Sequence, residues 1–466
     1  MDLLSCSAAN RFGLGARPGE LAAIKDDPRG WLAAQLAGNA PLLEGDDLPA
    51  SRQVLVEAAN LRRAKHAEDQ PAPEPGVSQP AVPGALKLAK YFRSVYLAES
   101  RTRLRAAVQT DRPFVERLVH FWANHFAVSA DKPAVTGIAG AFEREAIRPH
   151  VLGRFGTMLR AVEQHPAMLL YLDNQRSIGP DSRAVRFIAR RQRGAVGPGG
   201  RHPGINENLA REMLELHTLG VDGGYTQVDV TAFAGILTGW SVGRDGLFEF
   251  RDAWHEPRAS TLLGKRFAQA GLAQGEAVLE DLARHPATAR HIARKLAVHF
   301  VVDDPPSALV DRLARTFLDG GGDLLAVYRA LLESDLAWRP AAGKFKTPAD
   351  YIVSAHRALS LPVEDGPRSL AAFTLLGQRP WMPGSPAGWP DRTADWAGSA
   401  AVFKRVQWAN AVAARLRSRR RADALAPEVL GARLSAHSRR AISGADSAAQ
   451  ALTLLLACPE FMWRPA

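Results

Sequence analysis

The chain has 466 residues, of which 46% are hydrophobic and 23% charged, so it can bury a sizeable core in one large domain or two closely packed ones. Its formal net charge of +11 comes mostly from arginine, and the charge is spread along the chain, which fits a GC-rich bacterial genome better than a nucleic-acid partner. No apolar run approaches the roughly 20 residues that a membrane-spanning helix needs, so no transmembrane segment is expected.

Apolar residues recur at helical spacing through most of the sequence, and strand-like alternation is rare. The sequence therefore predicts a mainly α fold, a multi-helix globular unit with long loops and little or no β-sheet. The helices are expected at residues 21–36, 86–108, 112–126, 135–145, 155–163, 206–219, 227–237, 275–284, 286–300, 306–318, 324–332, 348–359, 400–417 and 447–457.

Several helix ends carry recognisable signals. Thr226 followed by Asp229 resembles a capping box, and Gly220 is well placed to end the preceding helix. The short connections favour one large unit over residues 1–466, with two packed sub-domains, at about residues 1–245 and 270–466, as the alternative.

Three stretches interrupt the helical pattern. Residues 69–84 are rich in proline and predict a flexible loop. Residues 177–204 are rich in glycine and arginine, and they predict either disorder or a lid over Asp173 and Glu212. Residues 378–399 carry three tryptophans among prolines and glycines, and we expect them to pack across a surface or the mouth of a cleft.

The segment LVHFWANHF contains the first candidate site. At about 100° per residue, His120 and Asn124 share one face of a helix, whereas His125 points about 140° away. His120 and Asn124 could therefore bind one metal ion or one substrate together. The alternative is that His120 and His125 are core histidines with satisfied hydrogen bonds.

The segment NENLAREMLELHTLG contains the second candidate site. Asn208, Arg211, Glu212 and Glu215 form one polar stripe, and two carboxylates a turn apart suit metal ligation or acid–base catalysis. We expect both to be largely buried next to His120 or Asn124. The alternative is an exposed ion pair between Arg211 and Glu215. His217 leaves the helix nearly opposite Glu215, so we predict that it packs in the core.

Asp173 and Asn174 follow an apolar helix end. Paired oxygen ligands at such a position suit a hard cation, and they suit a turn somewhat better. The two cysteines, Cys6 and Cys458, have no metal-ligand spacing, and we expect two separate thiols.

Several blocks together resemble one known family. LVHFWANHFAVS, FGTMLRAVEQHPAMLLYLDN, GINENLAREMLELHTLGVDGGYTQVDV, FAGILTGW, RHIARKLAVHFVVDDPP and LLLACPEFMWR are similar to the bacterial domain of unknown function 1800 (DUF1800), over about residues 9–464. The resemblance implies no particular reaction. It does imply a possible partner, because genes of this family often neighbour members of family DUF1501, which resemble sulfatase- and phosphatase-type metalloenzymes. Many relatives are exported.

We therefore expect a polar or metal-binding site between the helix of His120 and the helix of Glu212, with an unspecified reaction and the possibility of a divalent metal ion. The alternative is a non-catalytic helical partner of a DUF1501 protein. The N-terminus lacks the features of a signal peptide, so a cytoplasmic protein is expected, with export alongside a signal-bearing partner as the alternative. The predicted catalytic residues are Glu212, Glu215, His120 and Arg211. The predicted substrate-binding residues are Asn124, Asn208 and Trp122. The predicted metal ligands are Glu212, Glu215, His120 and Asp173.

Overall fold

The fold is mainly α-helical, as predicted. The computed structural model describes residues 3–45, 47–68, 84–192, 204–339, 343–416 and 421–465. Helices make up 63% of the structure, and the strands of the described residues form two small antiparallel hairpins. The predicted proline-rich loop falls almost entirely on residues 69–83, outside the described part of the chain.

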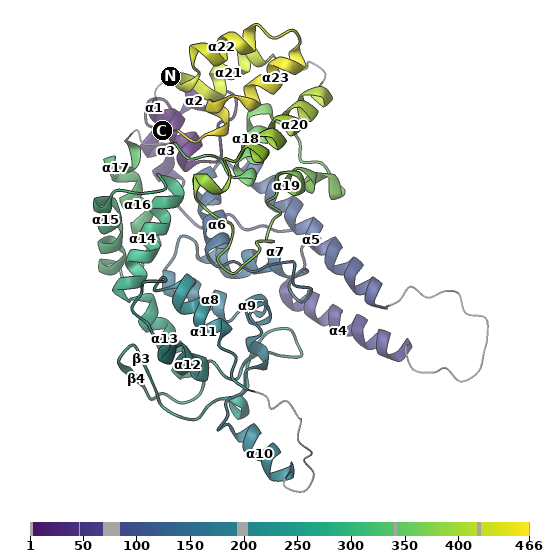
Figure 1. Cartoon of the computed structure of the whole chain (residues 1–466), viewed down its shortest axis with the longest axis vertical. Coiled ribbons are helices and arrows are strands. Elements are labelled where there is room, and N and C mark those ends of the chain that lie inside the picture. The colour runs from purple at the N-terminus through teal and green to yellow at the C-terminus, as the bar shows by residue number, and fades with distance from the viewer. Residues whose placement is uncertain are drawn as a thin grey trace, which may run out of the picture.

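Figure 1 shows the arrangement of the elements in space. The α-helices of the first half are α1 (Leu3–Ser7), α2 (Glu20–Ala23), α3 (Pro28–Ala34), α4 (Ser51–Glu68), α5 (Gly84–Gln109), α6 (Pro113–His125), α7 (Ala139–Phe142), α8 (Phe155–Glu163), α9 (Pro166–Tyr171), α10 (Arg183–Gln192), α11 (Asn208–Glu212) and α12 (Gln227–Ile236). The strands are β1 (Trp240–Val242), β2 (Phe248–Phe250), β3 (Ser260–Leu262) and β4 (Lys265–Phe267). The α-helices of the second half are α13 (Leu272–Ala283), α14 (Pro286–Phe300), α15 (Ser307–Asp319), α16 (Leu324–Glu333), α17 (Asp335–Trp338), α18 (Pro348–Leu359), α19 (Ala371–Leu376), α20 (Ser399–Leu416), α21 (Ala422–Leu430), α22 (Ala436–Ser443), α23 (Ala448–Ala457) and α24 (Pro459–Met462).

Three of the predicted helices are interrupted. The helix expected at residues 21–36 is two, because Asp27 caps a new start at Pro28 by accepting from the Gly30 amide. The helices expected at residues 135–145 and 206–219 each pass into a wider π-helical turn, η2 (Glu143–Ile147) and η5 (Met213–His217). Such turns shift the faces on which the following side chains lie.

Several regions of structure were not predicted, including the helices α4, α19, α21 and α22. The hairpins pair Ser241 with Glu249 and Thr261 with Arg266, and each strand has only three residues, too few for alternation to stand out in the sequence. Helix α10 occupies Arg183–Gln192, within the stretch expected to be a loop, whereas residues 193–203 lie outside the described part.

The buried apolar side chains form one continuous cluster that draws on both halves of the chain. The two ends of the chain lie close together (Figure 1). There Arg11, on the π-helical turn η1 (Ala8–Phe12), donates to the carbonyls of Ala337 and Pro465. As expected, Cys6 and Cys458 are two separate buried thiols. In the described residues no helix is both long and apolar enough to cross a membrane.

Candidate active site

Helix α6 lies at the centre of the candidate site. Pro113 occupies its first turn, and most of its residues are buried, including the charged Glu116 and Arg117. Buried charges require partners, because the loss of hydration is otherwise uncompensated. Glu116 pairs with Arg148, and Arg117 pairs with Asp350 of α18. Beside α6, residues of α5, α14, α18, α19 and the segment 378–391, together with Arg464, enclose a cavity.

We call this space the α6 cavity. It has a volume of about 80 Å³ and is open to solvent on one side. Such a volume holds several water molecules or one small polar group. Its polar lining includes His120, Asn124, His299, Asp350, Asp391 and Arg464.

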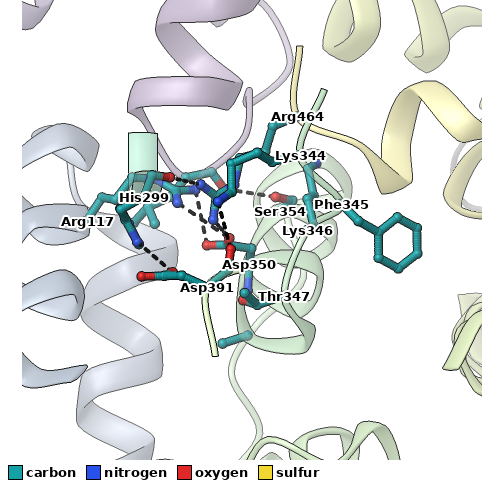
Figure 2. A network of polar contacts seen from close by, with 12 residues as sticks. Arg117, His299, Lys344, Phe345, Lys346, Thr347, Asp350, Ser354, Asp391 and Arg464 are labelled. Carbon is teal, nitrogen blue, oxygen red and sulfur yellow. Dashed lines mark hydrogen bonds and ion pairs between the residues drawn. The ribbon is translucent and has the colours of Figure 1, made fainter. Parts of the chain in front are cut away.

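One wall of the α6 cavity is an ion network around Asp350 (Figure 2). This carboxylate accepts from Arg117 Nη2 at 3.1 Å and from Arg464, and both guanidinium groups are buried. The two arginines hold the pKa of Asp350 far below its usual range although burial alone would raise it. Arg464 also donates to the His299 carbonyl at 2.6 Å, which ties the C-terminus to α14.

His299 and Asp391 form a second pair at the cavity. Nδ1 of His299 lies 3.0 Å from Oδ1 of Asp391. Burial lowers the pKa of His299 to about 4, against the opposing effect of Asp391, so the ring is neutral near pH 7. A neutral ring that donates from Nδ1 to the carboxylate carries its lone pair on Nε2. This Nε2 is buried and has no hydrogen-bond partner among the described residues.

Lys344 fixes the position of Asp391 on its loop. Its ammonium group donates to the carbonyls of Val298 at 2.6 Å and Asp391 at 2.7 Å, and to Asp303 Oδ1 at 2.8 Å. Asp303 in turn accepts from the Thr393 amide at 2.9 Å. Lys344 and Asp303 therefore hold the loop on both sides of Asp391, and the loop keeps the Asp391 carboxylate beside His299.

The tryptophan-rich segment covers the other side of the cavity, as expected from its composition. Trp381 and Trp389 both belong to the lining. Asn124 Nδ2 donates to the Trp389 carbonyl at 2.8 Å, and the Trp389 amide donates to Asn124 Oδ1 at 2.7 Å. Gly388 has a φ of +81°, and a Cβ there would lie 2.3 Å from the Asn124 carbonyl oxygen. Only glycine fits this close crossing of loop and helix.

His120 belongs to a neighbouring network that also contributes to the cavity. Its Nε2 lies 3.5 Å from Glu116 Oε1, and Glu116 makes two bonds to Arg148 at 2.6 and 2.8 Å. Arg148 also contacts Glu143, which accepts from Arg103 Nε at 2.7 Å. Burial lowers the pKa of His120, and Arg103 lowers it further.

The family model described as protein of unknown function (DUF1800) matches residues 7–463, nearly the whole chain. The chain belongs to the DUF1800 family. No curated protein matches it, and no solved structure matches it. The family assignment agrees with the resemblance seen in the sequence blocks. The family model is described as one of unknown function, so it assigns no reaction to this DUF1800 protein.

The structure brings two of the predicted site residues to the α6 cavity, His120 and Asn124. The amide of Asn124 is used to hold the Trp389 backbone, so its observed role is to position the loop. Trp122, also predicted to bind substrate, does not line the α6 cavity. Its side chain is fully buried, and Nε1 donates to the Tyr328 hydroxyl at 2.6 Å in the core.

The site residues predicted on the second helix, that of Glu212, lie outside the lining of the α6 cavity. Arg211 pairs with Glu207 at 3.0 Å and not with Glu215. Glu212 is only partly buried, and this desolvation raises its pKa. Glu215 lies beside the Tyr225 hydroxyl and is also partly exposed. None of these residues lines the α6 cavity, so the expectation that Glu212 and Glu215 are largely buried beside His120 or Asn124 is wrong.

Asn208 is exposed and also lies outside the cavity lining. Asp173 forms an ion pair with Lys132 at 2.6 Å and adopts the turn conformation, with a φ of 59°. In the described residues no three His, Cys, Asp or Glu side chains gather as a metal-ligand group, so Glu212, Glu215, His120 and Asp173 do not form the predicted set. Asn174 is buried and donates to the Leu237 and Trp240 carbonyls.

His217 packs in the core, as predicted. Its side chain is fully buried, and Nδ1 lies 2.7 Å from Glu163 Oε1 at the end of α8. The π-helical turn η5 starts at Met213, so the helix is not straight as assumed, but His217 still points away from Glu215 toward α8.

Sequence reasoning missed the central residues of the site, which are Arg117, His299, Asp350, Asp391 and Arg464. They come from segments up to several hundred residues apart, and none forms a local motif. One signal was available for Arg117, because a charged residue in a strongly apolar helix implies a buried partner.

Proposed function

We propose that this protein is an enzyme whose α6 cavity performs general base chemistry on a small anionic or polar substrate. The observation that carries the proposal is the geometry of His299, which meets Asp391 through Nδ1 and has a buried Nε2 without a partner in the described residues. A carboxylate that orients a neutral imidazole is the usual arrangement of a histidine base.

In this reading His299 Nε2 accepts a proton from a bound water molecule or substrate hydroxyl. Asp391 holds the Nδ1–H in place and stabilises the imidazolium that forms. The proton is then returned from Nε2 to the leaving group or the product. His120, on the adjacent network, is a second neutral imidazole near the same space.

The charges around the cavity support an anionic substrate. Three arginines, at positions 103, 379 and 464, and two aspartates, at positions 350 and 391, belong to its lining. Arg464 is already paired with Asp350, whereas the ion pair of Arg379 with Asp131, at 3.1 Å, is exposed. Exposed pairs are weak, so Arg379 can exchange Asp131 for a substrate carboxylate or phosphate.

The first experiment is a hydrolysis panel of p-nitrophenyl esters and p-nitrophenyl phosphate with the full chain. His299→Asn keeps a donor to Asp391 and removes the base, and we expect it to lower kcat about 100-fold or more. Asp391→Asn should also lower kcat, because it favours the wrong tautomer. The exposed His437→Asn is the matched control and should leave kcat unchanged. Equal kcat values for wild type and His299→Asn contradict the proposal.

The second experiment detects binding without turnover. Acetate, malonate and inorganic phosphate are each added to the wild-type chain and to Arg379→Ala, and Tm is measured. At least one anion should raise Tm of the wild type, and Arg379→Ala should weaken that rise. If the wild type shows neither hydrolysis nor anion binding, the proposal fails. Co-purification with a DUF1501 protein would then favour the alternative of a non-catalytic partner.

A further inference from the structure

A second pocket lies among α5, α18, α19 and α20, helices that pack on one another (Figure 1). We call it the α20 pocket. Its volume is about 410 Å³, larger than that of the α6 cavity, and falls within the about 300–1,000 Å³ typical of small-molecule sites. The two spaces share no lining residue, although α19 contributes Phe373 to the α6 cavity and Leu375 to the α20 pocket.

The wall of the α20 pocket is mainly apolar. Leu104 of α5 lies on one side, and Trp408, Val412 and Leu416 of α20 lie on the other. Leu375 is 41% exposed, which marks the open end of the pocket. An apolar space of this size favours a ligand with a hydrocarbon body, because filling it removes apolar surface from water.

The rim of the pocket is cationic. Arg415 and Arg368 both belong to the lining and are exposed, whereas Glu364 is the acidic residue among them. Arg415 and Glu364 are 4.0 Å apart, with side chains 74% and 51% exposed, so their ion pair is weak and can open. An arginine released from such a pair can hold a carboxylate through two parallel hydrogen bonds.

One polar atom lies within the pocket. Nδ1 of His356 is buried and has no hydrogen-bond partner among the described residues. Burial lowers the pKa of His356, so the ring is uncharged near pH 7 and does not oppose an apolar ligand.

We propose that the α20 pocket binds one molecule of a single-chain anionic amphiphile, of the fatty-acid class. The hydrocarbon chain lies against Leu104, Trp408 and Val412. The carboxylate lies at the rim with Arg368 and Arg415. The inference does not depend on the reaction at the α6 cavity.

The test uses isothermal titration calorimetry with the full chain and three probes. Dodecanoate and dodecyltrimethylammonium are kept below their critical micelle concentrations, and dodecanol is kept below its solubility limit. We expect dodecanoate to bind one molecule per chain and at least tenfold more tightly than the ammonium compound. The double variant Arg368→Glu/Arg415→Glu should reverse this order. Equal affinities for all three probes, or several molecules per chain, would overturn the proposal.

A blocking variant tests the location. Ala372→Trp fills the pocket from α19 and should weaken dodecanoate binding at least tenfold. Ala308→Trp, at an exposed position of α15, is the matched control and should bind as the wild type does. Ala411→Trp at the pocket mouth replaces Ala372→Trp if circular dichroism indicates that the latter is unfolded. Undiminished binding by a folded blocking variant, or no binding by the wild type, contradicts the proposal.

Discussion

Asn124 and Trp389 hold each other through two hydrogen bonds, of 2.8 and 2.7 Å, in which the side-chain amide of Asn124 pairs with the backbone of Trp389 in both directions. The two bonds resemble the reciprocal backbone hydrogen bonds between antiparallel strands. They connect α6 to a loop 265 residues further along the chain. The loop covers the α6 cavity and leads directly to Asp391, so the contact determines where the carboxylate partner of His299 lies.

Asn124→Ala should lower the free energy of unfolding by about 1–3 kcal/mol, because it leaves a partly buried backbone amide and carbonyl without partners. Urea unfolding followed by circular dichroism measures the change. Asn208→Ala is the control, since Asn208 is exposed, and should change the free energy of unfolding by less than about 0.5 kcal/mol. A similar small change for Asn124→Ala would contradict the assigned role.

Gly388→Ala should disturb the same crossing from the loop side. The added Cβ would meet the Asn124 carbonyl oxygen at 2.3 Å, and the φ of +81° is unfavourable for alanine. We expect Tm to fall by several degrees and binding at the α6 cavity to weaken. In the same loop, Gly384→Ala is the matched control, because no atom lies within 4 Å of its Cβ position. Equal Tm values for the two variants would refute the steric argument.

The buried pair of His217 and Glu163 makes a third prediction. Both side chains are fully buried and 2.7 Å apart, so His217→Ala should leave Glu163 without its partner and lower the free energy of unfolding by about 3 kcal/mol or more. A double-mutant cycle with Glu163→Gln measures the coupling between the two residues. His437→Ala serves as the exposed control. Additive effects of the two substitutions would exclude a direct interaction.

The stability of the protein should fall as the solution is acidified. Burial lowers the pKa of both His299 and His291 from 6.5 to about 4. Below pH 6.5 the unfolded chain therefore binds protons that the folded chain does not. Each histidine should then reduce the free energy of unfolding by up to about 1.4 kcal/mol per pH unit between pH 6.5 and 4, and contribute no slope above that window.

Urea unfolding at a series of pH values measures this slope, and His299→Asn should reduce it. Carboxylates such as Asp350, whose pKa is lowered far below its usual range, add a further loss only below about pH 4. The two contributions are separable because they act in different pH windows. A slope between pH 6.5 and 4 that is the same in wild type and His299→Asn would contradict the assignment to this histidine.

Most of the helical fold could be predicted from the sequence. Apolar spacing located α8, α14 and α18 to the residue, and the capping box of Thr226 and Asp229 marked the start of α12. These features depend on side chains within a few residues of one another, so the sequence contains them directly. The same local geometry placed His217 in the core, because its direction follows from its position on the helix.

The candidate site depended on the tertiary structure. Glu212 and Glu215 have the local pattern of functional carboxylates, yet their helix leaves both partly exposed. Asp350 and His299 look ordinary in the sequence, and they gain their electrostatic environment from Arg117, Arg464 and Asp391. Helical periodicity predicts which side chains share a face of a helix. It does not predict which other element packs against that face. The residues that form the site are determined by burial and by charge pairing between segments hundreds of residues apart. Both arise only when the chain has folded.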